Sequence, residues 1–222
     1  MTEKLWNKLE TENFIFFYPP KGFVEENIQK LSVEREKAFL TLNKIFQDQL
    51  PEKIRWFFLE SGERGIKLLG DISPNQALAP ILTIFTVYNE KHDSTPGHEL
   101  THILSFYWNS GFTNSYKFLS EGLARSFDQS GRNHHALAKK LKNENKIISF
   151  SKILPPQDFN AADPDITYIQ SASFVKWLID NYGWEKLAKV WLVKKDLLSE
   201  TEKIYGISLE KLENLWLGFL SH

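Results

Sequence analysis

The chain has 222 residues, with 27 lysines and arginines against 28 aspartates and glutamates, so its formal charge is −1. Because neither sign dominates, the balance argues against a strongly basic nucleic-acid-binding protein and against an acidic tail protein. Hydrophobic residues make up 42% of the chain and aromatic residues 14%, which is ample for a core, so we expect a folded protein.

The sequence contains no cysteine. Disulfides, thiolate zinc sites and cysteine nucleophiles are therefore excluded, and a transition metal would have to be bound by histidine and carboxylate. No apolar run approaches the roughly 18 to 20 residues of a membrane helix, so we expect no membrane span. The first residues do not resemble a signal peptide. A cytoplasmic location is favoured, and the alternative is an exported form whose signal has been removed.

The first half of the chain alternates strand and helix signals. Residues 13–18 are short and aromatic and end at two prolines, which predicts a strand, and residues 24–46 carry apolar side chains at helical spacing. Residues 53–59 predict a second strand. Residues 61–75 are rich in glycine and polar residues and predict a loop with a possible short helix, whereas 77–88 should supply one or two more strands.

The second half is predicted to be helical, with helices over residues 97–108, 115–129, 134–143, 167–181, 184–194 and 208–219. Gly183 and Gly206 are expected to end helices, and the prolines at 155, 156 and 164 to bracket a loop. This order predicts an α+β protein in which a mixed lobe, 1–96, precedes a helical lobe, 97–222.

The segment His98-Glu99-Leu100-Thr101-His102 carries the most specific chemistry. Helix positions four apart share a face, so His98 and His102 can reach one ion from one rigid element, with the carboxylate of Glu99 beside them. This arrangement is typical of two zinc ligands and a general base. The alternative is that this segment only begins a surface helix and that the hydrogen-bonding groups of its two histidines are partly satisfied.

A catalytic zinc ion needs a third protein ligand and an open position. Glu121, in the segment Leu119-Ser120-Glu121-Gly122, follows His102 after 18 residues, on a predicted neighbouring helix. We also expect Thr95 to cap the helix that carries His98 and His102, and Pro96 to occupy the first position of that helix.

An HExxH motif followed by 18 residues and Glu-Gly resembles the gluzincin metallopeptidases, with the spacing of the aminopeptidase N and leukotriene A4 hydrolase group and of peptidase MA-like proteins. The resemblance is specific over residues 94–128 and looser elsewhere. It implies that His98, His102 and Glu121 bind one Zn²⁺ ion and that Glu99 is the base. It also implies a thermolysin-like zincin fold with the zinc site in a cleft between the two lobes.

Two further residues enter through the same resemblance. The family often carries a Glu seven positions after the third ligand, where this chain has Asp128; it either orients a ligand histidine or is a solvated residue near a helix end. Tyr168, near the start of a later helix, either donates its phenolic hydrogen to the developing oxyanion or caps a hydrophobic face.

The chain departs from the aminopeptidases at one motif. Their Gly-x-Met-Glu-Asn segment is absent, since Met1 is the only methionine, and Glu90 cannot be carried over as an amine anchor. Aminopeptidase specificity is therefore not predicted.

We expect a zinc metallopeptidase that acts on a peptide or protein, with an edge strand from residues 77–88 pairing with the substrate. The alternative is a zinc-binding but catalytically inactive binding or scaffold protein. The adjacent His134 and His135 point to different faces and are expected to form a solvent-exposed helix start.

Overall fold

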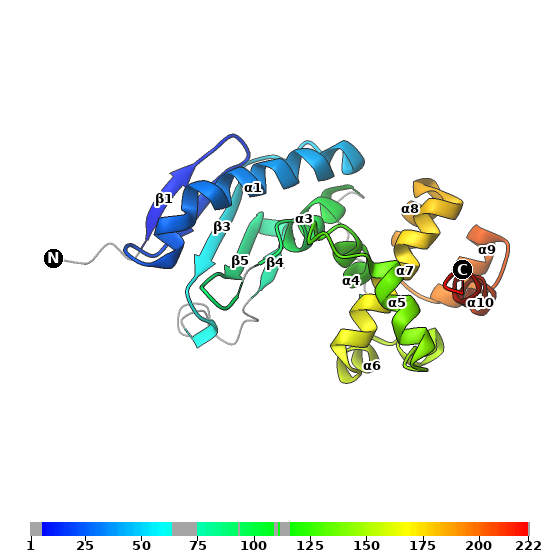
Figure 1. Ribbon diagram of the computed structural model, residues 1–222. Helices are drawn as coiled ribbons and strands as arrows, with labels where there is room; N and C mark the ends of the chain where they lie inside the picture. The colour runs from blue at the N-terminus through cyan, green and yellow to red at the C-terminus, as the bar shows by residue number, and fades with distance from the viewer. Residues whose placement is uncertain (1–5, 64–74, 93, 109–110, 112–115, 222) are drawn as a thin grey trace. The chain divides into compact units, whose positions relative to one another are not determined.

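The computed structural model describes residues 6–63, 75–92, 94–108, 111 and 116–221 (Figure 1). The chain divides into two compact units. Met1–Gly111 and Asp128–Ser130 form the first, and Phe112–Phe127 and Gly131–His222 form the second. The coarse prediction of an α+β protein is confirmed, because a five-stranded sheet is combined with helices.

The first unit contains the sheet, in which two antiparallel strands flank three parallel ones. The strand order is β1 (Asn7–Glu10), β2 (Phe14–Tyr18), β3 (Ile54–Leu59), β5 (Thr83–Val87) and β4 (Gln76–Leu78). The strands predicted over 13–18 and 53–59 are confirmed, and the segment 77–88 supplies two strands. The polar strand β1 was not predicted, because a charged edge strand lacks the apolar alternation that marks a strand in sequence.

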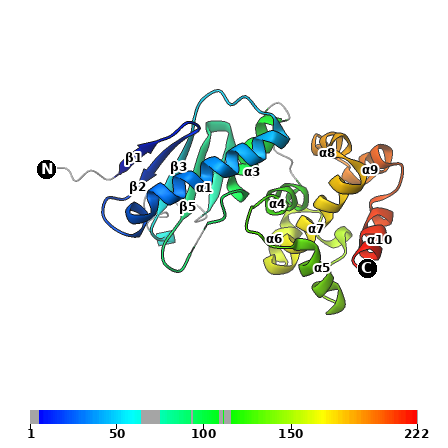
Figure 2. The ribbon, with the colours of Figure 1, turned by 45° about the horizontal axis from the view of Figure 1, so that its top comes forward.

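Helix α1 (Phe23–Phe46) lies along one face of the sheet, as Figures 1 and 2 show. Successive strand residues point to opposite faces, and on the face toward α1 the fully buried Phe14 and Trp56 belong to neighbouring strands. The Phe14 ring meets Phe39 of α1 edge-on, with centroids 5.9 Å apart. Burial of these aromatic rings therefore holds α1 to the sheet.

Helix α3 (His98–Trp108) packs against α1, β4 and the short 3₁₀ helix η1 (Ala79–Ile81). This packing buries the apolar side chains of Leu100, Ile103 and Leu104. The helix accordingly belongs to the first unit, whereas the predicted boundary at residue 96 placed it in the helical lobe.

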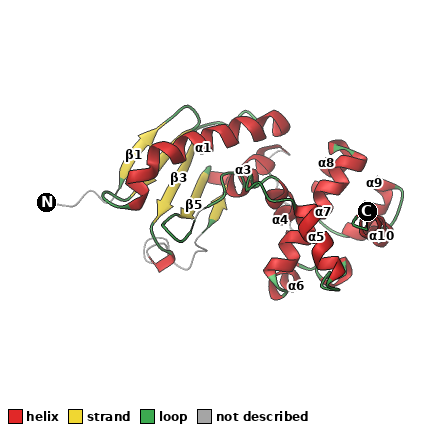
Figure 3. Ribbon diagram, in the orientation of Figure 1, coloured by secondary structure: helices red, strands yellow, loops and turns green. Residues whose placement is uncertain are grey.

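In the described residues of the second unit, every regular element is a helix (Figure 3). They are α4 (Lys117–Ser126), α5 (His134–Asn143), η2 (Phe150–Lys152), α6 (Pro156–Ala161), α7 (Pro164–Tyr182), α8 (Trp184–Trp191), α9 (Leu197–Tyr205) and α10 (Leu209–Phe219). Within the described part of the chain, no helix is both long enough and apolar enough to cross a membrane.

Two helices of this unit depart from the sequence prediction. The expected loop after the prolines at 155 and 156 is wrong, because α6 and the first turn of α7 occupy it, with proline at each helix start. Helix α9 was not predicted; Asp196 caps it and Gly206, in the left-handed conformation, ends it. Most of the predicted 61–75 loop lies outside the described residues.

Helices α4 and α7 approach each other unusually closely at Gly122. A Cβ atom added at this glycine would lie 2.8 Å from the carbonyl oxygen of Ser171 and 2.8 Å from Cγ2 of Val175. The close approach therefore requires glycine, and it fixes where α4 crosses α7.

The two adjacent histidines begin α5, but His134 is buried rather than solvent-exposed, which corrects the prediction. His135 Nδ1 lies 2.9 Å from Ser173 Oγ, which accepts a hydrogen bond from Trp216 Nε1. The Ser173 hydroxyl can therefore donate to a neutral His135. Burial, and then the nearby Lys176, lower the His135 pKa; Asp180 opposes them and His134 adds to them.

Substitution of Gly122 by alanine should destabilise the second unit by about 1–3 kcal/mol, because the added methyl group overpacks the α4–α7 contact. Gly218→Ala is the matched control: it also lies in a helix, but nothing is within 4 Å of its added Cβ. The control should be neutral or more stable by up to about 1 kcal/mol. Urea unfolding of both variants checks this, and equal stabilities would contradict it.

The lowered His135 pKa makes stability depend on pH. The unfolded chain, with a histidine pKa of about 6.5, binds a proton before the folded chain does. The stabilising contribution is thus complete above about pH 6.5 and is lost as the pH falls from there through the folded pKa. His135→Gln should flatten the decrease in unfolding free energy between pH 7.5 and 5.5; an unchanged slope would contradict this.

Candidate metal centre

The first turns of α3 present two imidazole rings on one face of the helix. The ring centroids of His98 and His102 lie 5.0 Å apart with planes at 86° to each other, and both residues are partly exposed. Residues on the opposite face, such as Ile103, are buried in the first unit. The helix therefore holds the two nitrogen donors in a fixed relation.

Glu121 of α4 completes a group of three ligands. One ligand atom from each of His98, His102 and Glu121 lies within 4.8 Å of the other two. Two ligands about 2.1 Å from one zinc ion are at most about 4.2 Å apart, which is close to the 4.8 Å that encloses these three ligand atoms. The group can hold a metal ion, and two imidazoles with one carboxylate suit zinc.

Glu99 lies between the histidines in sequence, with 8% of its surface exposed. Its side chain makes no hydrogen bond or ion pair with another residue that the structure describes. A carboxylate in this position keeps its acceptor oxygens for a small molecule such as water.

Hydrogen bonds at Gly97 determine where α3 begins. Its carbonyl oxygen accepts from the backbone nitrogen and from Oγ1 of Thr101, each at 2.8 Å, and its own N–H donates to the carbonyl of Asp128 at 3.0 Å. The helix starts at His98, so Pro96 precedes the helix instead of occupying its first position. Among the described residues, the Thr95 side chain makes no capping hydrogen bond to this helix.

Asp128 lies beyond the end of α4 and is buried, so the solvated alternative is wrong. Its Oδ1 accepts a hydrogen bond from the Ser130 backbone at 2.8 Å, and its carbonyl binds Gly97. The residue thus supports the start of the histidine-bearing helix through its backbone. Orientation of a ligand histidine by its carboxylate stays a prediction.

Tyr168 lies in the first half of α7, with its ring 5.5 Å from that of Phe159. Ser171, one turn further along α7, forms the close contact with Gly122, which follows Glu121 in sequence. Tyr168 and Glu121 thus both lie near the crossing of α4 and α7. A catalytic role for Tyr168 stays a prediction.

The sequence did not predict that Arg35 would lie near the start of α3. Arg35 is fully buried and contacts Ser94, four residues before His98. A signal was present, because Arg35 falls in the apolar register of α1, four residues after Leu31 and three before Ala38.

No protein-family model matches the chain, and no curated protein is significantly similar to it.

The native chain should bind one zinc ion, and His102→Asn should weaken zinc affinity at least a hundredfold, because it removes one of three ligands. His92→Asn is the control, since His92 is exposed and its side chain contacts Asn89. Competition with a chromophoric chelator measures both affinities. Equal zinc affinities of the two variants would contradict the ligand assignment.

Proposed function

We propose that this protein is a zinc-dependent metallopeptidase of the gluzincin kind, with a thermolysin-like arrangement of the HExxH helix beside the sheet. The observation that carries the proposal is the convergence of the ligand atoms of His98, His102 and Glu121 within 4.8 Å. These are the three residues that the motif and its 18-residue spacing single out, with a buried carboxylate beside them.

The residues have distinct tasks in this proposal. His98 and His102 offer ring nitrogens and Glu121 a carboxylate oxygen. When bound, zinc would polarise the substrate carbonyl and lower the pKa of a water molecule to about 7. The Glu99 carboxylate accepts a proton from the attacking water and delivers one to the departing amine nitrogen. A hydrogen bond from the Tyr168 hydroxyl would stabilise the tetrahedral oxyanion.

An extended peptide or protein segment is the proposed substrate. Among the described strands, β4 ends the sheet and pairs on one side with β5, which supports its use as an edge strand for the substrate. Helix α3, which bears the histidines, packs against β4 in the same unit. A peptide added to that edge by backbone hydrogen bonds would run alongside the histidine-bearing helix.

The decisive variant is Glu99→Gln, which removes the proton acceptor and retains the shape of the side chain. It should keep the zinc content of the native protein and lower the rate at which a mixed peptide library is cleaved by about 10²–10⁴-fold. Glu90→Gln is the control, because Glu90 is an exposed carboxylate after β5 and should leave cleavage unchanged.

The outcomes separate the candidate functions. Absence of zinc from the native protein, with none taken up on addition, would refute the metallopeptidase. Zinc in the native protein and in Glu99→Gln, without cleavage by either, would favour a binding or scaffold protein.

A further inference from the structure

A fully buried guanidinium lies between α1 and the sheet. Arg35 is 0% exposed, and its Cζ lies 5.4 Å from the ring centroid of Trp56 and 5.5 Å from that of Phe58. Burial of a cation in an aromatic core is costly unless hydrogen bonds and ion pairs compensate it. The groups that bind the Arg35 guanidinium therefore indicate the role of this residue.

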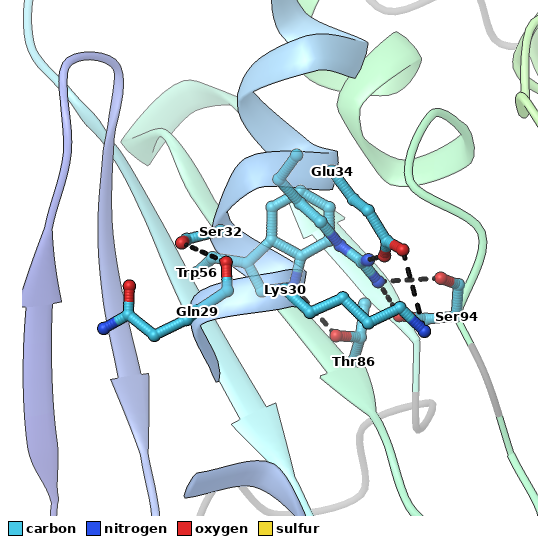
Figure 4. A network of polar contacts seen from close by, with 8 residues as sticks. Gln29, Lys30, Ser32, Glu34, Trp56, Thr86 and Ser94 are labelled. Carbon is cyan, nitrogen blue, oxygen red and sulfur yellow. Dashed lines mark hydrogen bonds and ion pairs between the residues drawn. The ribbon is translucent and has the colours of Figure 1, made fainter. Parts of the chain in front are cut away.

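Two described hydrogen bonds of Arg35 go to the segment that leads into α3. Its Nη2 donates to the carbonyl oxygen of Ser94 at 2.8 Å and lies 2.9 Å from Ser94 Oγ. Its Nη1 donates to the carboxylate of Glu34 at 2.9 Å. Figure 4 shows the side chains of Glu34 and Ser94 close together on one side of this network, with Trp56 on the other side.

The network also reaches the sheet. Trp56, on β3, donates from Nε1 to Thr86 Oγ1 of β5 at 2.8 Å (Figure 4). The ring beneath the guanidinium is thus held in place by its own hydrogen bond. Arg35 of α1 therefore contacts Ser94 from a position against two paired parallel strands.

Ser94 is itself buried and precedes His98 by four residues. The approach to α3 is thereby held at two points, at Ser94 by Arg35 and at Gly97 by the Asp128 carbonyl. The first turn of the helix carries His98 and Glu99, so movement of Ser94 would shift the orientation of both.

We propose that Arg35 is a positioning residue for the metal centre, acting through Ser94 on the start of α3. The inference rests on the proposed metal centre and adds a residue some 60 positions earlier in the chain (98 − 35 = 63). The guanidinium suits the task, because its Cζ lies over two aromatic rings while Nη2 donates to Ser94. Lysine lacks this combination of donors and stacking.

The test compares Arg35→Met and Arg35→Lys with Phe39→Leu. Phe39 is buried on the same helix and contacts Phe14, so its substitution weakens the same core without touching Ser94. Zinc affinity is measured by chelator competition, and amide hydrogen exchange of Gly97 and Thr101 is measured on the zinc-free proteins. Urea unfolding supplies the stability of each variant.

Arg35→Met should weaken zinc affinity about 10–100-fold, as loss of residues that orient ligands does, and should accelerate exchange at Gly97 and Thr101. Arg35→Lys should recover part of both effects. Phe39→Leu should lower stability and leave zinc affinity within about twofold of native. If Arg35→Met does not fold, the comparison of Arg35→Lys with Phe39→Leu decides.

Equal effects of the Arg35 and Phe39 variants on zinc affinity, at matched stability, would overturn the inference and leave Arg35 as core packing. Failure of the native protein to bind zinc would refute the proposed metal centre, and with it the role of Arg35 toward that centre. Hydrogen exchange would still show separately whether Arg35 holds the start of α3.

Discussion

The hydrogen bonds at Gly97 are the constraint on which the candidate site depends. Its carbonyl accepts both the backbone and the hydroxyl of Thr101, while its N–H is bound by the carbonyl of Asp128. A slip of the sequence by one position along this helix would turn His98 and His102 by about 100° around its axis. The start of the histidine-bearing helix is therefore anchored at a glycine that has no side chain of its own.

A second constraint operates in the helical unit, where the chain bears the carboxylate ligand. Gly122 lets the backbone of α7 approach α4 closely enough that a methyl group would collide with Ser171 and Val175. Glu121 precedes this contact, so the position of its side chain on α4 follows from the packing of two helices. The close packing of α4 and α7 thus explains why a glycine follows Glu121 in this chain.

Regular, strongly patterned elements could be predicted from sequence. Helix α1 and strands β2 and β3 were, because their apolar residues recur at helical or alternating spacing. Strand β1 and helix α9 were missed, since their formation depends on a neighbouring strand and on caps at Asp196 and Gly206. The prolines at the starts of α6 and α7 indicated a loop, although proline also favours the first helical turn.

The sequence by itself determined the chemistry that is available: no thiolate, two histidines one turn apart, a carboxylate between them, and Glu121 after 18 residues. Those features are local, because helical periodicity alone places His98 and His102 on one face. Only the tertiary structure decided that the three ligand atoms converge, that Asp128 is buried, and that Arg35 binds Ser94. These contacts join residues far apart in the chain, and their formation depends on how α1, the sheet and the later helices pack.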